Sequence, residues 1–295
     1  MKTLTAYNWA DYELIDSGNE RRLERFGKFI FDRPEPKALW NKSLSPSDWQ
    51  RAHAVYYRSD KGGGSWKFVK QVPPEWKIQW RDLTFLMKPT GFKHMGVFPE
   101  FASIWEWEQQ VIKKSLLNKP GYQPHILNLF GYTGASTLAA AAAGAKVTHV
   151  DGSREVVTWA RENAKLSRLE DKPVRWLIED IMTYVKREVK RGTKYDGIII
   201  DAPKFGRGDR GEVWKIEEHL PKLMDICLQL LTPKPLFVLL VSYATEYSST
   251  TLENTLSQKM KPFKGTIESG EMTLQQSSNS FLLPTAMYSR WEEKI

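Results

Sequence analysis

The stretch HILNLFGYTG, residues 125–134, decides the fold of this chain of 295 residues. Its apolar first half predicts a short strand, and Gly131 and Gly134 in the following turn let the backbone approach a ligand closely. An alanine-rich segment and the run VTHVD, residues 147–151, come next. The spacing suits one helix and a second strand, and it places Asp151 where a carboxylate can accept from both hydroxyls of a ribose. The stretch therefore predicts the nucleoside-binding half of a Rossmann-like domain.

Strands and helices alternate beyond Pro124. The expected strands are Ile126–Phe130, Lys146–Val150, Val174–Ile178, Gly197–Ile200 and Leu236–Val241. The expected helices are Glu100–Leu117, Ala135–Ala143, Arg154–Leu166, Ile181–Arg191, Glu217–Leu231 and Ser249–Met260. Such alternation predicts an α/β fold with a parallel, doubly wound sheet. The last two runs, Lys264–Glu268 and Phe281–Tyr288, have no helix between them, so we expect a mostly parallel, seven-stranded sheet that ends in an antiparallel hairpin.

Residues 1–90 are expected to form a small β-rich substrate-recognition domain, and residues 91–295 the Rossmann-like domain. The strand-like runs of the first domain are Tyr12–Gly18, Arg22–Phe31, His53–Tyr57, Trp66–Val69 and Lys77–Met87. Residues 1–100 hold 17 Lys and Arg against 12 Asp and Glu, together with six of the twelve tryptophans. Basic residues interleaved with aromatics are typical of nucleic-acid-binding surfaces. Tryptophans also fill the thin core of small β domains, so both interpretations stay open.

The composition narrows the class of protein. The net charge of +8 favours an anionic partner, although many enzymes are mildly basic. No apolar run approaches the roughly 20 residues of a membrane-spanning helix, and the N-terminus lacks an apolar signal core. One cysteine cannot form an internal disulfide. We therefore expect a cytoplasmic protein. The five histidines lack metal-ligand spacing, so no metal site is expected.

In a doubly wound sheet, ligands bind at the carboxyl ends of the strands. The segment Asp151-Gly152-Ser153 follows the second strand, and Asp151 is expected to bind the ribose. Asp180 and Ile181 follow the third strand, where they could accept from the amino group of an adenine and pack on its ring. Both aspartates also precede predicted helices, so helix capping is an alternative for each.

The fourth strand runs into DAPKFGRG, residues 201–208. A related motif in amino-methylating enzymes accepts from the target amine and stacks the flipped base on its aromatic ring. This resemblance implies that Asp201 orients a substrate amine and Phe205 stacks on a target base, with Pro203 making the loop rigid. Lys204, Arg207, Arg210 and Lys215 would bind phosphates. A loop with solvated charges explains these four basic residues equally well.

The turn from Asn128 to Gly134 resembles motif I of S-adenosylmethionine (SAM) dependent methyltransferases. The segment Asp201–Phe205 is related to the Asp-Pro-Pro-aromatic motif of amino-methylating enzymes. Together they resemble the large-subunit ribosomal RNA methyltransferase family, which includes the 23S rRNA cytosine-5 and guanine-N7 enzymes, from about His94 to the C-terminus. The N-terminal segment is similar to that of a bacterial subgroup with a small β domain, rather than to an RNA-binding PUA domain.

The resemblance implies a class I methyltransferase fold, SAM as cofactor, and RNA as partner. In that family a T-G-x-F-x-D-Q-R segment contacts the cofactor. Here residues 95–101 stand in its place, with Glu100 for the acidic residue and Phe101 departing from Gln. The expected cofactor-binding residues are Gly96, Glu100, Asn128, Phe130, Gly131, Thr133, Gly134, Asp151, Gly152, Ser153, Asp180, Ile181 and Asp201. Asp201, Pro203 and Phe205 are the expected catalytic residues, and Lys204, Phe205 and Arg207 the expected substrate-binding residues.

One departure bears on the methylated atom. Methylation at C5 of cytosine requires a thiolate that adds to C6, and the cytosine-5 enzymes carry a cysteine just after the fifth strand. This chain has Val241-Ser242-Tyr243-Ala244 there. Its one thiol, Cys227, lies in an apolar helix and is expected to be buried. Methylation of a base nitrogen needs no covalent intermediate, so the sequence favours it.

Three functions follow from the sequence. The first is SAM-dependent methylation of a base nitrogen in RNA, with a role in ribosomal RNA processing. The second is methylation of a protein or a small molecule. The third is a noncatalytic binding module that keeps the fold as a scaffold.

Overall fold

The computed structural model describes residues 2–7, 9–59, 63–119, 121–207, 211–243 and 246–294, with only the backbone of Arg207. It divides into two compact units. The α/β unit consists of Met1–Leu4, Ile104–Met272 and Ala286–Ile295. The β unit consists of Thr5–Ser103 and Thr273–Thr285. The expected boundary between residues 90 and 91 stays a prediction, as does the role of the first domain in substrate recognition.

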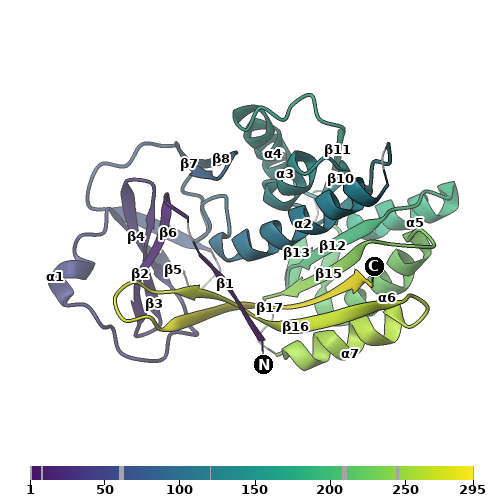
Figure 1. Ribbon diagram of the computed structural model, residues 1–295. Coiled ribbons are helices and arrows are strands. Elements are labelled where there is room, and N and C mark those ends of the chain that lie inside the picture. Colours follow the sequence, from purple (N-terminus) through teal and green to yellow (C-terminus); the bar gives the residue numbers. More distant parts are fainter. Residues whose placement is uncertain are drawn as a thin grey trace. The chain divides into compact units, whose positions relative to one another are not determined.

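The largest sheet has eight strands in the order β1-β16-β17-β15-β12-β9-β10-β11 (Figure 1). Their bounds are β1 (Lys2–Ala6), β9 (His125–Leu129), β10 (Lys146–Asp151), β11 (Val174–Ile178), β12 (Gly197–Ala202), β15 (Phe237–Ser242), β16 (Gly265–Gln275) and β17 (Leu282–Glu293). Strands β9 to β12 and β15 pair in parallel, and β17 is antiparallel to β15. The doubly wound fold with an antiparallel edge is thus confirmed.

The sheet differs from the prediction in the length of its final hairpin and in its number of strands. The final hairpin is much longer than predicted, because its first strand extends to Gln275 and its second to Glu293. In addition, β1 hydrogen-bonds to β16 and adds an eighth strand to the seven expected. No pattern in the five residues of β1 distinguishes a strand of this sheet from a strand of the N-terminal segment.

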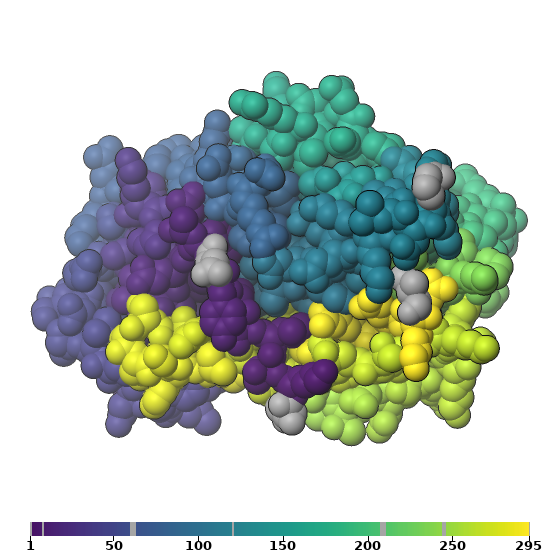
Figure 2. Space-filling model, in the orientation of Figure 1, coloured from purple at the N-terminus to yellow at the C-terminus, as the bar shows by residue number. Residues whose placement is uncertain are grey.

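Helices cover both faces of the sheet in the α/β unit (Figure 1). On one face lie α2 (Ala102–Asn118), α3 (Ala135–Ala142) and α4 (Arg154–Leu166), and on the other α5 (Ile181–Arg191), α6 (Ile216–Leu230) and α7 (Ser249–Met260). A one-turn 3-10 helix, η1 (Pro99–Phe101), precedes α2. Side chains of α2 and α4 lie at the surface in the space-filling view (Figure 2). Because both faces are covered, β12 and β15 are almost wholly apolar and buried.

The β unit contains a five-stranded sheet, β2 (Tyr12–Gly18), β3 (Arg21–Phe26), β4 (Phe29–Pro34), β5 (Ala54–Arg58) and β6 (Gly64–Phe68). A hairpin, β7 (Trp76–Trp80) with β8 (Leu83–Met87), and a short helix, α1 (Pro46–Trp49), complete it. The two long predicted runs each proved to be a hairpin. The first turns at Gly27, which has a φ of +62°, and the second at Arg81, with a φ of +51°. Residues 60–62, between β5 and β6, lie outside the described residues.

Four of the six N-terminal tryptophans, Trp9, Trp49, Trp76 and Trp80, are buried. Trp76 stacks on Phe31 at a ring distance of 5.4 Å. These side chains therefore fill the core of the β unit, and the interpretation of the tryptophans as core residues is confirmed for them.

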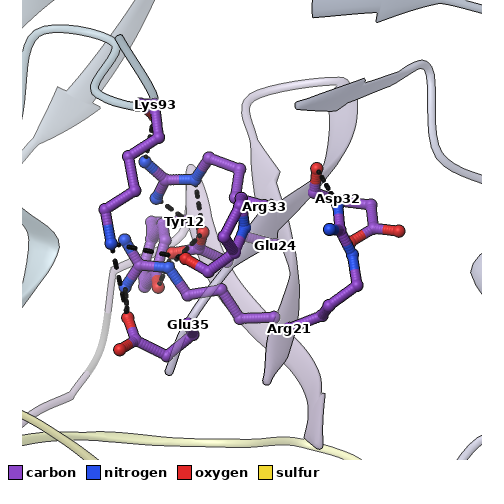
Figure 3. Close-up of polar contacts among 9 residues, drawn as sticks. Tyr12, Arg21, Glu24, Asp32, Arg33, Glu35 and Lys93 are labelled. Atoms are coloured by element: carbon purple, nitrogen blue, oxygen red, sulfur yellow. Dashed lines mark hydrogen bonds and ion pairs between the residues drawn. The ribbon is translucent and has the colours of Figure 1, made fainter. Parts of the chain in front are cut away.

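The same core contains a network of charged side chains (Figure 3). Glu24 is fully buried and pairs with Arg22 at 3.1 Å and with Arg33, whose Nε donates to it at 2.8 Å. The hydroxyl of Tyr12 donates to the same carboxylate. Burial raises the pKa of Glu24, but the two guanidinium groups outweigh burial and hold this pKa below its ordinary value. Glu24 is therefore ionised and forms ion pairs with both arginines.

We predict that Glu24→Gln destabilises the protein by about 3–5 kcal/mol, because two buried arginines lose their shared carboxylate. The contribution of Glu24 is present above its ordinary pKa of 4.5, since the folded pKa is lowered, and is lost as pH falls through the folded value. Thermal melting between pH 3 and pH 8 measures this. The control is Glu75→Gln, which breaks the exposed pair with Lys88 and should cost less than about 1 kcal/mol. Equal losses in the two variants would contradict the prediction.

Candidate active site

The register of the parallel strands brings three predicted site residues to one level. Leu129 pairs with Val150 of β10 on one side and with Ile200 of β12 on the other. The residues that follow Leu129, Val150 and Ile200 in the sequence are Phe130, Asp151 and Asp201, respectively. These three follow neighbouring strands at the same carboxyl edge, which is the ligand-binding edge of a doubly wound sheet.

The turn after β9 has an unusual backbone. Phe130 and Tyr132 have positive φ angles of 57° and 48°, and Gly134 follows with 85° at the start of α3. Positive φ is unfavourable for aromatic residues and persists only where the surroundings hold it. Such backbone concentrates at functional sites, which supports the assignment of this turn.

Asp151 holds the turn in place. One carboxylate oxygen accepts from the backbone N–H of Tyr132 at 2.9 Å, and the other from the N–H of Ser153 at 2.9 Å. The N–H of Gly131 also donates to the carbonyl of Val150 at 3.1 Å. Asp151 therefore joins the turn to the end of β10. Ser153 occupies the N-cap of α4, and Gly152 lies beside it, partly buried. The predicted ribose contact of Asp151 is compatible with these bonds, because a carboxylate oxygen accepts more than one.

Beneath the turn, three buried polar side chains form a chain of hydrogen bonds. The amide of Asn128 donates to the hydroxyl of Thr137 at 2.9 Å, and that hydroxyl lies 2.9 Å from Nδ1 of His149. Burial lowers the pKa of His149 to about 3, so its ring is neutral. Asn128 thus supports the turn from below, and the hydroxyl and imidazole are partners that the sequence analysis missed. The sequence does contain a sign of this network, because His149 is a polar residue at a buried strand position. In the sheet it pairs with Asn128 of the neighbouring strand.

Two predicted cofactor residues have structural contacts of their own. Asp180 is the N-cap of α5 and accepts from the N–H of Thr183 at 2.8 Å, so the capping alternative is confirmed for it. Ile181 is 4% exposed and belongs to the hydrophobic core. Thr133 is also buried, and its carbonyl accepts from Asn163. The adenine contacts of Asp180 and Ile181 stay predictions.

The loop after β12 folds into a small hairpin. Strands β13 (Phe205–Arg207) and β14 (Val213–Lys215) pair antiparallel, with Gly206 opposite Trp214. Asp201 is partly buried at the end of β12, whereas Phe205 is 52% exposed. Pro203 lies between the carboxylate and the accessible aromatic ring, and the catalytic roles of Asp201, Pro203 and Phe205 stay predictions.

The predicted phosphate contacts of Lys204 and Arg207 stay predictions. Lys204 forms an exposed ion pair with Glu246, and this pair raises the lysine pKa. An exposed pair of this kind is worth little energy and does not prevent an exchange of partners. The side chain of Arg207, like residue 208 of the predicted motif and like Arg210, lies outside the described residues.

Gly96 and Glu100 belong to the β unit. Gly96 is buried with a φ of 115°, and Glu100 is 2% exposed in η1. Burial raises the pKa of Glu100. Arg33 donates to the carbonyl of Lys93 at 2.7 Å. The charged network of the β unit therefore holds the backbone just before Gly96. The predicted cofactor contacts of Gly96 and Glu100 stay predictions.

Cys227 is buried in α6, as expected. Burial raises the pKa of its thiol, which keeps it protonated. Within the described residues, no group of three His, Cys, Asp or Glu side chains could hold a metal ion. No helix in the described part of the chain is long and apolar enough to cross a membrane.

The strand order, the glycine turn and the carboxylate after β10 define a class I SAM-dependent methyltransferase. The residues fit SAM, because Asp151 supplies a carboxylate of the kind that accepts from ribose hydroxyls and the turn leads into a helix N-terminus, without the Gly-Lys-Ser/Thr of a phosphate loop. The ribose contact of Asp151 itself stays a prediction. A crystal structure of the SAM-dependent methyltransferase from Agrobacterium tumefaciens is 39% identical to this chain, with a TM-score of 0.93, and covers 100% of this chain and 94% of that one. The chain belongs to the SAM-dependent methyltransferases.

More distant comparisons agree on the fold. The tRNA m1G37 methyltransferase from M. jannaschii is 11% identical with a TM-score of 0.54, over 96% of this chain and 75% of that one. The ribosomal RNA large subunit methyltransferase K/L of Shewanella frigidimarina is 26% identical over 175 residues, which is 59% of this chain. The chain spans only 23% of that relative's length. No family model matches the chain.

We predict that Gly131→Ala damages the turn. An added Cβ would lie 2.4 Å from the ring of His149, which is fully buried and cannot move aside. Overpacking of this kind costs about 1–3 kcal/mol, so the melting temperature should fall and SAM affinity should drop about tenfold. Calorimetric titration with SAM and thermal melting measure both. Gly91→Ala is the control, because nothing lies within 4 Å of its Cβ. Unchanged affinity and melting in Gly131→Ala would refute the role of this contact.

Proposed function

We propose that this chain transfers the methyl group of SAM to a base nitrogen in RNA, with large-subunit ribosomal RNA as the substrate. The observation that carries the proposal is the segment Asp201-Ala202-Pro203-Lys204-Phe205, which starts at the level of the cofactor turn and presents an exposed aromatic ring. The similarity to the ribosomal RNA large subunit methyltransferase K/L supports the choice of RNA.

In this proposal, Asp201 and Phe205 have different roles. The carboxylate of Asp201 accepts from the amino or ring N–H of the base and so orients the nitrogen. The ring of Phe205 stacks on the extruded base, which explains a half-exposed aromatic at this position. SAM supplies an electrophilic methyl group on its sulfonium. Asp151 holds the turn, and we propose that it also accepts from the ribose of the cofactor, with the backbone of Gly131 to Gly134 beside it.

A base nitrogen is favoured over C5 of a pyrimidine. A C5 reaction needs a thiolate close to the base, and the single thiol of the chain is protonated and buried in α6. Partly buried Tyr243 follows β15, where the cytosine-5 enzymes that the chain resembles have their cysteine. A nitrogen lone pair attacks the methyl group directly, so orientation by Asp201 and Phe205 is sufficient.

The test uses SAM with a tritiated methyl group and three separate acceptors: unmodified large-subunit rRNA transcribed in vitro, total protein, and a small-molecule extract. We expect label in the RNA, and a loss of about 100-fold in rate for Asp201→Ala, because the oriented acceptor is removed. Asp225→Asn is the control, since it changes an exposed carboxylate on α6 and should leave the rate unchanged. Label that appears only in protein or in small molecules would refute the RNA substrate.

The β unit offers a surface for the RNA. On the β5–β6 hairpin, Tyr57 pairs with Ser65 and Val55 with Lys67, so Tyr57 and Lys67 lie on the same face. Tyr57 is 51% exposed, Lys67 is exposed, and the guanidinium of Arg21 lies 5.9 Å from the Tyr57 ring. An accessible ring with an exposed lysine on the same face suits base stacking and phosphate contact, while Arg21 is already paired with Asp32. We propose that this face binds RNA outside the site of methyl transfer.

We predict that Tyr57→Ala combined with Lys67→Ala weakens RNA binding about tenfold or more, because stacking is worth about 1–3 kcal/mol per base. The dependence of affinity on salt should become less steep. Fluorescence anisotropy with labelled rRNA fragments at several salt concentrations measures both. Phe68→Ala is the control, because Phe68 is 50% exposed on the opposite face of the same hairpin. Equal effects of the two changes would exclude a specific role for the Tyr57 face. SAM affinity should not change in either.

A cytoplasmic location and a role in ribosomal RNA processing accompany this proposal, because both follow from the choice of substrate. They stay predictions.

A further inference from the structure

Trp214 lies between the cofactor turn and the proposed substrate segment. Its side chain is 8% exposed on β14. Its ring meets the ring of Phe130 edge to face, with the centroids 4.7 Å apart and an interplanar angle of 63°. Its indole Nε1 donates to the carbonyl of Pro203 at 2.7 Å. One side chain therefore touches both parts of the site.

The hydrogen bond to Pro203 belongs to a larger set that fixes the segment. The N–H of Ile216 donates to the carbonyl of Lys204 at 3.1 Å, and Gly206 pairs with Trp214 across the β13–β14 hairpin. The carbonyls of Pro203 and Lys204 thus accept hydrogen bonds from Trp214 and Ile216, respectively. These bonds fix the backbone of Pro203 and Lys204, which lie between Asp201 and Phe205.

Trp214 also contacts the cofactor turn, through the ring of Phe130. Phe130 has a φ of 57°, which is unfavourable for phenylalanine and requires packing to hold it. An edge-to-face pair at 4.7 Å supplies about 0.5–1.5 kcal/mol beyond burial. A shift of the turn moves Phe130, and the indole transmits that shift to the carbonyl of Pro203.

We infer that Trp214 is a positioning residue that couples the cofactor turn to the Asp201–Phe205 segment, so that binding of the cofactor sets the place of the target base. The inference rests on the proposed function, because it takes this segment as the substrate site. It assigns a role to a residue that is not among the expected catalytic or cofactor-binding residues.

The test compares Trp214→Phe with a matched control. Trp214→Phe keeps an aromatic ring beside Phe130 and removes the indole donor. The control is Trp107→Phe on α2, because Trp107 is also 8% exposed, donates from Nε1 to Glu292 at 2.8 Å, and meets Phe237 edge to face at 5.1 Å. Both substitutions remove one indole hydrogen bond and reduce one buried ring in the same unit. If Trp214→Phe does not fold, Trp214→Tyr replaces it.

The first readout needs no RNA. Hydrogen exchange of the peptide that covers residues 202–207 is followed by mass spectrometry with and without saturating S-adenosylhomocysteine. We expect the ligand to slow exchange there in the wild type and in Trp107→Phe, and to have no such effect in Trp214→Phe. The affinity for S-adenosylhomocysteine should stay within about threefold of the wild type, which is less than 1 kcal/mol.

The second readout is the methylation of large-subunit rRNA. In Trp214→Phe, kcat should fall about 10- to 100-fold while KM for RNA changes little, because misplacement of the segment affects the transition state rather than RNA binding. Equal effects of both substitutions on exchange and on kcat would reduce Trp214 to a structural role. Absence of ligand-induced protection in the wild type would also overturn the inference. A wild type that methylates no RNA would refute the proposed function alone, since the exchange experiment still decides the role of Trp214.

Discussion

The carboxylate of Asp151 holds the cofactor turn to the end of β10, and the proposed site depends on this attachment. The turn carries two aromatic residues at positive φ, a backbone that does not persist by itself. Hydrogen bonds to Asp151 and to the carbonyl of Val150 fix it from the side, and the buried ring of His149 leaves no room for a Cβ at position 131. A glycine is required at position 131 for this reason.

The remaining parts of the site derive their positions from the same edge of the sheet. The register of Leu129 with Val150 and Ile200 places Asp151 and Asp201 at one level, and the β13–β14 hairpin carries Phe205 outward from there. The thiol chemistry of pyrimidine C5 methylation is absent because the single cysteine is buried in α6. We propose instead that a carboxylate and an aromatic ring orient a nitrogen nucleophile.

The sequence predicted the parallel sheet well because its signals are local. Runs such as Gly197–Ile200, which are apolar throughout, and helices such as Ile181–Arg191, which end at Gly192, need no tertiary information. It failed where a pairing joins distant segments. Nothing local predicts that β1 joins β16, and the contact between Trp214 and Pro203 exists only because a hairpin forms between them. Asp180 shows a third case, in which one residue suited both a helix cap and a ligand contact, and the structure shows the cap.

The most direct test of this account is a crystal structure of the protein with S-adenosylhomocysteine. The account predicts density at the carboxyl edge of β9, β10 and β12, with the ribose hydroxyls within hydrogen-bonding distance of Asp151 and the sulfur directed toward Asp201 and Pro203. Density at another place, or a ribose that does not contact Asp151, would contradict it.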